Sequence, residues 1–195
     1  MPSATVVAEM PIVIEPLPPA VARAERQGLE ALYYAAFSPP PYAESLAEAE
    51  AFGTLVERDS RRAGFDAFVA RDASGQIVGL VYGYDTPAEV PGGAWWARLV
   101  LAVRLEVARE WVLGQFAFCW FVVLPEVQGE GTGGELYDAV MERVRTPRAW
   151  LVTHGDDSTA RGMYDRRGWF ELARAELGWV PGDRAVLALD RDRRR

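Results

Sequence analysis

The chain has 195 residues, 50% of them apolar, and a formal charge of −7 at pH 7; all 21 basic residues are Arg, and neither Lys nor Asn occurs. The absence of Lys excludes a phosphate-loop lysine, a Schiff-base lysine and a kinase-type ATP lysine. The single Cys and single His, Cys119 and His154, exclude an internal disulfide and a zinc cluster of the usual spacing. The acidic charge argues against nucleic-acid and anionic membrane surfaces, so we expect neither as a partner.

The length fits one domain of about 100 to 200 residues, which we expect over residues 1–189, with a disordered Arg-rich tail over 190–195. The first fifteen residues lack a basic region, and Pro11 interrupts their short apolar run, so no signal peptide is expected. No charge-free apolar stretch reaches the length of about 18 residues that a transmembrane helix requires. We therefore expect a cytoplasmic protein.

In the first part of the chain, the periodicity of apolar residues and the positions of turn residues predict both strands and helices. In order, these are a short strand at 12–15, a helix from 20 to the prolines at 39–41, a helix from 44 to about 62, a hairpin of strands at 65–71 and 77–84, a loop at 85–93 and a helix from 94 to about 114.

The later part begins with residues 116–124, which are almost wholly apolar and rich in aromatic and β-branched side chains. This pattern predicts a central strand buried on both faces. It is followed by a glycine-rich turn at 128–134, a helix with Leu136, Val140 and Val144 on one face, a strand at 149–154, a helix at 158–167 and a closing hairpin of 170–178 with 184–190. The combination predicts an α/β fold with a mixed sheet flanked by helices.

Four glycines lie within the six residues from Gly129 to Gly134, between the predicted central strand and the following helix. Closely spaced glycines let consecutive backbone N–H groups point inward, and the start of a helix adds the positive end of its dipole. Such a turn can hold a phosphate or pyrophosphate without lysine or metal. The alternative is a turn whose glycines only allow close packing of the helix on the strand.

Gly129, Gly131 and Gly134 also satisfy the dinucleotide fingerprint G-x-G-x-x-G, and Asp156 or Asp157 follows at a distance suited to a ribose hydroxyl. In a dinucleotide-binding domain the fingerprint follows its strand directly and opens a long series of βαβ units. Here residues 125–128 intervene, and the chain ends in a predicted hairpin. The context therefore argues against this class.

Two linked patterns in this region resemble the GCN5-related N-acetyltransferases, the GNAT family. The first resembles the acetyl-CoA pyrophosphate motif Val-x-Pro followed by Gln-x-x-Gly-x-Gly, and consists of Val123, Pro125, Gln128, Gly131 and Gly133. The second resembles Asn-x-x-Ala-x-x-x-Tyr-x-x-x-Gly-Phe, and consists of Asp157, Ala160, Tyr164, Gly168 and Trp169. The order and separation of the two patterns are similar to those of the family.

The resemblance implies a GNAT-like mixed, mostly antiparallel sheet of about six to seven strands flanked by helices, with a splayed pair of central strands. It also implies that the pantetheine arm of acetyl-CoA bonds to the backbone of the strand that ends at Val-x-Pro. The residues implied to bind acetyl-CoA are Phe121, Val122, Val123, Gln128, Gly129, Glu130, Gly131, Thr132, Gly133, Gly134 and Asp157. Phe121 and Val122 also fit ordinary core packing, and Asp157 also fits a helix cap.

Tyr164 matches the position at which the family has the tyrosine that protonates the departing CoA thiolate. A phenol with a pKa of about 10 suits this task, and we expect its hydroxyl to be exposed. The alternative is an aromatic residue that packs its helix on the sheet.

The general base is left open by the sequence. Positions where relatives carry a Glu hold Trp120 and Val152 here, so His154 is the histidine available to accept a proton. A His without a catalytic role and an amine that arrives already neutral are the alternatives.

The resemblance places acceptor selectivity in the first two helices with their loop and in the stretch before the central strand. The aromatic residues implied there are Tyr42, Tyr84, Trp95, Trp96 and Trp120. We interpret Trp95 and Trp96, which follow a Gly-Pro-rich loop, as an apolar or aromatic acceptor wall. Core packing and a dimer contact are the alternatives.

The resemblance thus implies an N-acetyltransferase that uses acetyl-CoA as cosubstrate, without a metal, and transfers an acetyl group to a primary amine of a small molecule or protein by direct attack. One alternative, suggested by the missing Glu at Trp120, is a non-catalytic acyl-CoA-binding module. A dinucleotide-binding enzyme is the other. The expected partner is a small-molecule amine or peptide acceptor, and analogy with the family suggests a homodimer.

Overall fold

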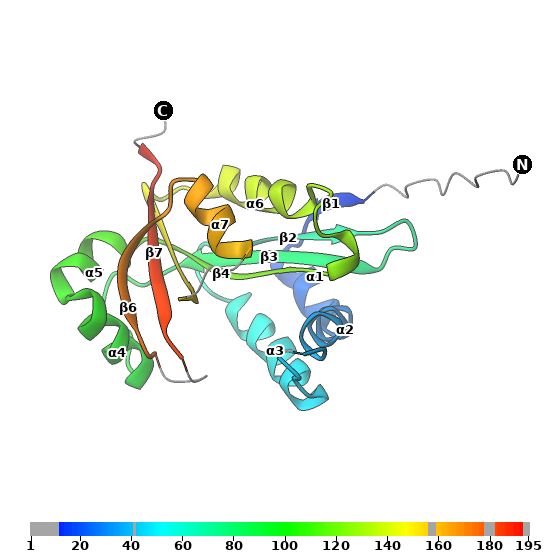
Figure 1. Cartoon of the computed structure of the whole chain (residues 1–195), viewed down its shortest axis with the longest axis horizontal. Helices are drawn as coiled ribbons and strands as arrows, with labels where there is room; N and C mark the ends of the chain where they lie inside the picture. Colours follow the sequence, from blue (N-terminus) through cyan, green and yellow to red (C-terminus); the bar gives the residue numbers. More distant parts are fainter. Residues whose placement is uncertain (1–11, 41, 156–158, 178–181, 193–195) are drawn as a thin grey trace, which may run out of the picture. The chain divides into compact units, whose positions relative to one another are not determined.

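The computed structural model describes residues 12–40, 42–155, 159–177 and 182–192 (Figure 1). The elements in chain order are β1 (Val13–Pro16), α1 (Pro19–Ala24), α2 (Arg26–Phe37), α3 (Leu46–Asp59), β2 (Asp66–Arg71), β3 (Ile77–Asp85), α4 (Ala94–Val103), α5 (Leu105–Trp111), β4 (Phe116–Val123), the 3-10 turn η1 (Pro125–Val127), α6 (Thr132–Arg143), β5 (Arg148–His154), α7 (Thr159–Arg166), β6 (Phe170–Ala175) and β7 (Arg184–Asp190). The predicted order of strands and helical segments is confirmed, although the helix expected from 20 to the prolines is divided at Glu25 into α1 and α2. None of the helices described is both long and apolar enough to cross a membrane.

Seven strands form one mixed sheet in the order β1-β2-β3-β4-β5-β7-β6. Pairing is antiparallel between β1 and β2, β5 and β7, and β6 and β7, and it is parallel between β4 and β5. The predicted mixed, mostly antiparallel sheet flanked by helices is therefore confirmed.

The parallel ladder between β4 and β5 is short. Its register comprises Phe116 with Ala149 and Ala117 with Trp150, although the strands have 8 and 7 residues and are described in full. The two strands thus part after Ala117 and Trp150, and the predicted splayed pair is confirmed.

The chain forms two compact units, and β3 and β4 contribute to both. Unit 1 comprises Met1–Ser60, Asp66–Val81 and Phe121–Arg143, and unit 2 comprises Arg61–Phe65, Tyr82–Trp120 and Val144–Arg195. Each unit is described below by itself. The expectation of a single domain over residues 1–189 stays a prediction.

Unit 1 combines a sheet region covered by α6 with a cluster formed by α1, α2 and α3. Helix α6 packs on β1 and β2, while α1, α2 and α3 pack on one another. A capping box fixes the start of α3, because the Glu48 carboxylate accepts the backbone N–H of Ser45 at 2.6 Å. The buried ring of Tyr33 in α2 stacks on that of Phe52 in α3 at 4.5 Å between centroids.

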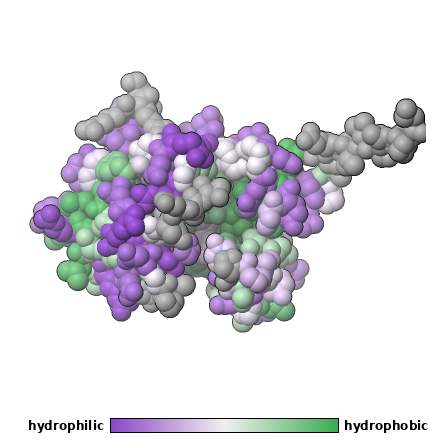
Figure 2. All heavy atoms as spheres, in the orientation of Figure 1, coloured by the Kyte–Doolittle hydropathy of each residue, from purple (hydrophilic) through white to green (hydrophobic). Residues whose placement is uncertain are grey.

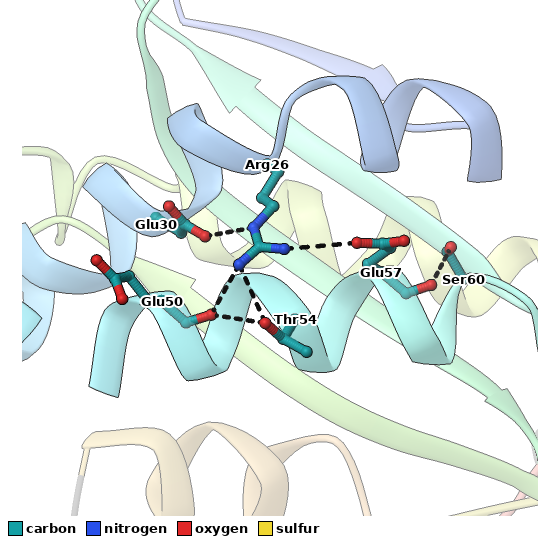
Figure 3. Close-up of polar contacts among 6 residues, drawn as sticks. All are labelled: Arg26, Glu30, Glu50, Thr54, Glu57 and Ser60. Atoms are coloured by element: carbon teal, nitrogen blue, oxygen red, sulfur yellow. Dashed lines mark hydrogen bonds and ion pairs between the residues drawn. The ribbon is translucent and has the colours of Figure 1, made fainter. Parts of the chain in front are cut away.

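A single guanidinium ties α2 to α3 (Figure 3). The Nε atom of Arg26 lies 2.6 Å from a Glu30 carboxylate oxygen, and its Nη1 atom lies 3.5 Å from Glu57. Its Nη2 atom donates to the Thr54 hydroxyl at 3.0 Å and to the Glu50 carbonyl at 3.4 Å. The planar fork of Arg suits this spread of acceptors on two helices.

Unit 2 has helices on both faces of its part of the sheet. Helix α4 packs on β6 and α5 packs on β5, around a buried cluster that includes Leu99, Ala117 and Trp150. Phe118, the next residue along β4, instead meets Tyr164 of α7 at 6.0 Å between ring centroids. Because successive side chains of a strand point to opposite faces, α4 and α7 cover opposite faces of β4.

The surface of the described residues mixes hydrophilic and hydrophobic side chains (Figure 2). Large apolar side chains are exposed singly on several elements, among them Val13 on β1, Leu46 on α3, Leu101 on α4 and Phe170 on β6. Scattered exposure of this kind is normal for folded proteins and marks no site by itself.

Three sequence predictions need correction. The helix expected from 94 to about 114 is broken at Arg104, a non-glycine residue with φ 69°. The strand at 116–124 is buried on both faces only over Phe116–Phe118, whereas residues 119–121 are half-buried because the ladder to β5 ends before them. The expectation of a disordered tail from 190 is wrong for its first residues, since Asp190 ends β7 and the Arg191 side chain donates to the Thr146 carbonyl at 2.7 Å, and residues 193–195 lie outside the described residues.

Gly83 in β3 provides a stability test. A Cβ atom there would overlap the carbonyl oxygen of Ala117 and the ring of Phe116, and a backbone atom cannot move aside cheaply. Gly83→Ala should lower the free energy of unfolding by at least about 2 kcal/mol, measured by urea titration. Gly92→Ala is the matched control, because nothing lies within 4 Å of a Cβ atom placed on that residue, and it should be neutral or slightly stabilising. Equal unfolding midpoints would contradict the close approach.

Candidate functional site

The glycine-rich turn follows β4 within unit 1 and has a backbone that side chains would strain. After η1, Gly129 has φ 86° and Gly131 has φ 97°. Residues with a Cβ rarely adopt this left-handed region. Nothing lies within 4 Å of a Cβ built at either glycine, so their conformation and open surroundings, not packing, account for the residue type.

The turn leads into the start of α6, whose first N–H groups face no protein acceptor. The first hydrogen bond of the helix runs from the N–H of Glu135 to the carbonyl of Gly131 at 3.1 Å. Within the described chain, no acceptor is recorded for the N–H groups of Thr132, Gly133 and Gly134. These donors, together with the helix dipole, form a place where an anion is stabilised.

The other residues of the turn hold its shape. A Cβ on Gly133 would lie 3.2 Å from the Phe121 ring, so this glycine serves the close packing of helix on strand that the sequence left open. The Gln128 side chain donates to the Val123 carbonyl at 2.8 Å and closes the turn. All of the predicted acetyl-CoA contacts, including those of Phe121, Val122 and Glu130, stay predictions, and Asp157 lies outside the described residues.

Tyr164, the predicted acid, lies in unit 2 and is only 5% exposed. Its ring contacts Phe118 at 6.0 Å and Trp169 at 5.7 Å between centroids, and these two rings are 6.2 Å apart. The side chain as a whole is therefore buried: α7 turns the ring toward the sheet, where two other aromatic rings pack against it. A catalytic role requires the leaving group to reach a hydroxyl at the edge of this cluster.

His154, the predicted base, is exposed at the end of β5, and its Nδ1 atom lies 3.1 Å from Nη1 of Arg184. A guanidinium only donates hydrogen bonds, so Nδ1 must accept. The proton of the neutral ring then sits on Nε2, which becomes a donor. This arrangement occupies the lone pair that a general base would use.

Asp85 is a titratable residue that no sequence motif singles out. It ends β3 half-buried, and burial raises the pKa of its carboxyl. The backbone bond from Thr86 to Gln115, 2.9 Å long, places it beside the first residues of β4. Asp85 therefore lies at the paired end of β4 and not at the point where β4 and β5 part. Its position directly after a predicted strand is the only signal in the sequence.

The aromatic residues predicted to meet an acceptor fall into separate groups. In unit 2, Tyr84, Trp95 and Trp96 are half-buried and pack against the same core cluster, with the guanidinium of Arg62 over the Tyr84 ring at 4.6 Å. Trp120 is half-buried in β4 of the same unit.

Tyr42 lies in unit 1, exposed, with its ring edge-to-face on Phe37 at 5.2 Å. The loop that carries it is held by a hydrogen bond from the Tyr33 hydroxyl to Glu44. Burial and this bond raise the pKa of Tyr33. Ala43, next to Glu44, has φ 52°, an uncommon conformation for a residue with a Cβ.

The described residues contain no group of three or more His, Cys, Asp or Glu side chains placed to hold a metal ion. The backbone N–H groups of the turn in unit 1 are donors of a kind that can neutralise a phosphate without a metal.

Comparison with known proteins identifies the family of the chain. Residues 26–169 match the model of the acetyltransferase (GNAT) family. No curated protein sequence matches the chain.

Several solved structures share its fold. A structure of histone acetyltransferase HPA2 and related acetyltransferase from Corynebacterium glutamicum is 18% identical, with a TM-score of 0.61 over 92% of this chain and 96% of that one. An acetyltransferase of the GNAT family from Streptococcus pneumoniae is 14% identical, with a TM-score of 0.58 over 92% and 99%. A chimera of spermidine N-acetyltransferase SpeG from Vibrio cholerae with hSSAT is 17% identical, with a TM-score of 0.54 over 93% and 96%.

At these identities the solved structures establish the fold, and the family model, which covers most of the sequence, establishes the relationship. The chain belongs to the GNAT family of acetyltransferases.

Proposed function

We propose that this protein is an acetyl-CoA-dependent N-acetyltransferase that transfers the acetyl group to a primary amine by direct attack. The observation that carries the proposal is the turn before α6, where two glycines have positive φ and three consecutive N–H groups have no protein acceptor in the described chain. Within a GNAT chain, this turn suits the pyrophosphate of CoA.

Acetyl-CoA would supply a thioester, and the chain would bind and orient it. The N–H groups of Thr132, Gly133 and Gly134 would donate to pyrophosphate oxygens. The hydrogen bond from the Gln128 side chain to the Val123 carbonyl would hold these donors in a fixed position relative to the end of β4. Backbone dipoles fixed in advance bind an anion without reorganisation, which explains how a chain without Lys could bind CoA.

In the proposed transfer, the nitrogen of a neutral amine attacks the thioester carbonyl, a C–N bond forms, and the C–S bond breaks. The amine loses one proton, and the thiolate gains one. We assign the protonation of the thiolate to the Tyr164 hydroxyl. Because Arg184 occupies the lone pair of His154, we assign the removal of the amine proton to water, and the amine binds in its neutral form.

A non-catalytic acyl-CoA-binding module is the second candidate, because Trp120 stands where many relatives carry Glu. Both candidates bind CoA, but only the enzyme releases free thiol.

Ligand-dependent unfolding tests the cosubstrate. Acetyl-CoA at 100 times its Kd should stabilise the fold by about 2.7 kcal/mol, seen as a higher melting midpoint, whereas NAD and ATP at the same concentration should leave the midpoint unchanged. A shift with NAD alone would favour a dinucleotide enzyme and overturn the proposal. A shift with acetyl-CoA, but no thiol release across a panel of primary amines, would exclude the enzyme and support the non-catalytic binding module.

Gly131→Ala tests the glycine turn. The substitution places a Cβ on a residue with φ 97°, so the turn must change shape, and acetyl-CoA binding should weaken about tenfold or more, measured by calorimetry. The matched control is Gly75→Ala, which imposes a similar strain at φ 85° in the β2–β3 hairpin. The control should lose similar stability and keep its affinity. Equal affinities for both variants would remove the turn from the site.

Tyr164→Phe tests the proposed acid, because it deletes the hydroxyl and retains the ring cluster. We expect kcat to fall about 100-fold with an unchanged Kd for acetyl-CoA. The exposed Tyr34 provides the control substitution Tyr34→Phe, which should change neither constant. An unchanged kcat for Tyr164→Phe would restrict this residue to packing.

A further inference from the structure

The connection between β3 and β4 is far longer than its geometry requires. The strands are neighbours in the sheet, and the N–H of Thr86 donates to the Gln115 carbonyl at 2.9 Å across their ends. A hairpin at this point needs about two to five residues, yet residues 86–115 lie between the strands and form α4 and α5. Long insertions with closed ends often carry binding functions.

Helix α4 begins with two indoles that meet a third. The Trp95 and Trp96 rings are 5.0 Å apart with an interplanar angle of 89°. Their centroids lie 6.3 Å and 5.8 Å from that of Trp150 in β5. Trp150 is buried, and its Nε1 donates to the Thr86 hydroxyl at 2.8 Å, which fixes the indole in one orientation.

This indole cluster, defined as Trp95, Trp96 and Trp150, lies where β4 and β5 part. Trp150 belongs to the last register pair of the ladder, with Ala117. Beyond that pair, Cys119 and Val152 are half-buried and pack against the same core cluster as Trp95 and Trp96. All of these residues belong to unit 2.

Core packing alone does not account for both indoles. Leu99 and Val103, one and two turns after Trp95, are 0% and 3% exposed and already fill the interior, whereas Trp95 and Trp96 remain half-buried. The two half-buried indoles meet edge to face, so part of their aromatic surface is left for a further ring. Aromatic groups prefer stacked and edge-to-face partners.

The charge of α4 favours a neutral group over a polycation. Its sequence contains no Asp or Glu, and its only charged residue is Arg98, which is exposed. A polyamine chain would find no carboxylate on this helix and would meet a positive charge. A planar hydrocarbon ring has neither disadvantage.

We propose that Trp95 and Trp96 bind an aromatic ring of the acceptor, so that the substrate is a primary amine carried by a short alkyl chain on a planar aromatic group. The inference rests on the proposed function. It adds the acceptor class and assigns the start of α4 to its recognition.

A matched pair of amines tests the proposal by thiol release. 2-Phenylethylamine and 2-cyclohexylethylamine share the amine and the chain length, and differ in the planarity and quadrupole of the ring. We expect kcat/KM to be about tenfold higher for the phenyl compound. Equal values, or a preference for the cyclohexyl compound or for spermidine, would overturn the aromatic site.

Substitutions assign the preference to residues. Trp95→Leu and Trp96→Leu should raise KM for 2-phenylethylamine about tenfold, with little change in kcat or in the Kd for acetyl-CoA. The control is Trp111→Leu on α5, whose indole instead packs on Phe170 at 5.0 Å and under the Arg148 guanidinium at 4.3 Å. It should keep the preference, and equal losses in all three variants would overturn the assignment. If a Leu variant unfolds, Trp96→Phe retains a ring and should keep a reduced preference, whereas its complete loss would contradict ring recognition.

The two proposals can fail separately. Turnover of non-aromatic amines with no effect of Trp95 or Trp96 would overturn the acceptor class and leave the N-acetyltransferase. Without thiol release from any amine, the proposed enzyme fails, and calorimetry of 2-phenylethylamine against the wild type and Trp96→Leu still tests the aromatic site. Binding lost in the variant supports the site, and equal or absent binding overturns it.

Discussion

The parallel ladder between β4 and β5 ends after two residue pairs, and the arrangement of unit 2 follows from that end. Aromatic rings cover both faces of the sheet there. On one face, Trp150 of the last pair supports the indoles of α4; on the other, Phe118, one residue beyond the pair, meets Tyr164 and Trp169. The end of the ladder therefore coincides with two aromatic clusters, one on each face of the sheet.

The glycine turn of unit 1 meets a constraint set by composition. A chain without Lys must offset a phosphate charge with Arg, a metal or backbone dipoles. The positive φ angles of Gly129 and Gly131 and the donors at the start of α6 supply the third of these. The four glycines do not share one task, since Gly133 makes room for the Phe121 ring. Close packing and anion binding, which are alternatives on the sequence alone, are thus compatible in one turn: the missing side chain of Gly133 allows the packing, and the backbone N–H groups, without an acceptor among the described residues, are free for the proposed anion.

Local patterns predict most elements because their causes are local. Turn residues predict the Asp72–Gly75 hairpin, and the structure has Asp72 accepting the N–H of Ser74 at 2.9 Å and Gly75 at φ 85°. Glycine spacing alone predicts the turn before α6. The break at Arg104 escapes prediction because neither Gly nor Pro marks it, and packing of two short helices imposes its backbone conformation.

The candidate chemistry depends on distant contacts, which a single sequence does not encode visibly. His154 and Arg184 are 30 residues apart, so the occupied lone pair was not predictable. The burial of Tyr164 depends on Phe118, far earlier in the chain. The hydrogen bond from Trp150 to Thr86 spans 64 residues. Residue types and their order predict the candidate catalytic and binding residues, whereas tertiary packing decides which of their atoms can still contact a substrate.

The Arg26 network shows what an all-Arg chain gains. One guanidinium reaches Glu30, Glu57, Thr54 and a backbone carbonyl, a set that the compact ammonium of Lys could not span. The same choice has a chemical consequence for an N-acetyltransferase. A guanidinium stays protonated at any physiological pH and is a poor nucleophile, so acetyl-CoA, the proposed cosubstrate, would meet no lysine ε-amine on this chain. The positive charges on its surface would thereby be protected from acetylation.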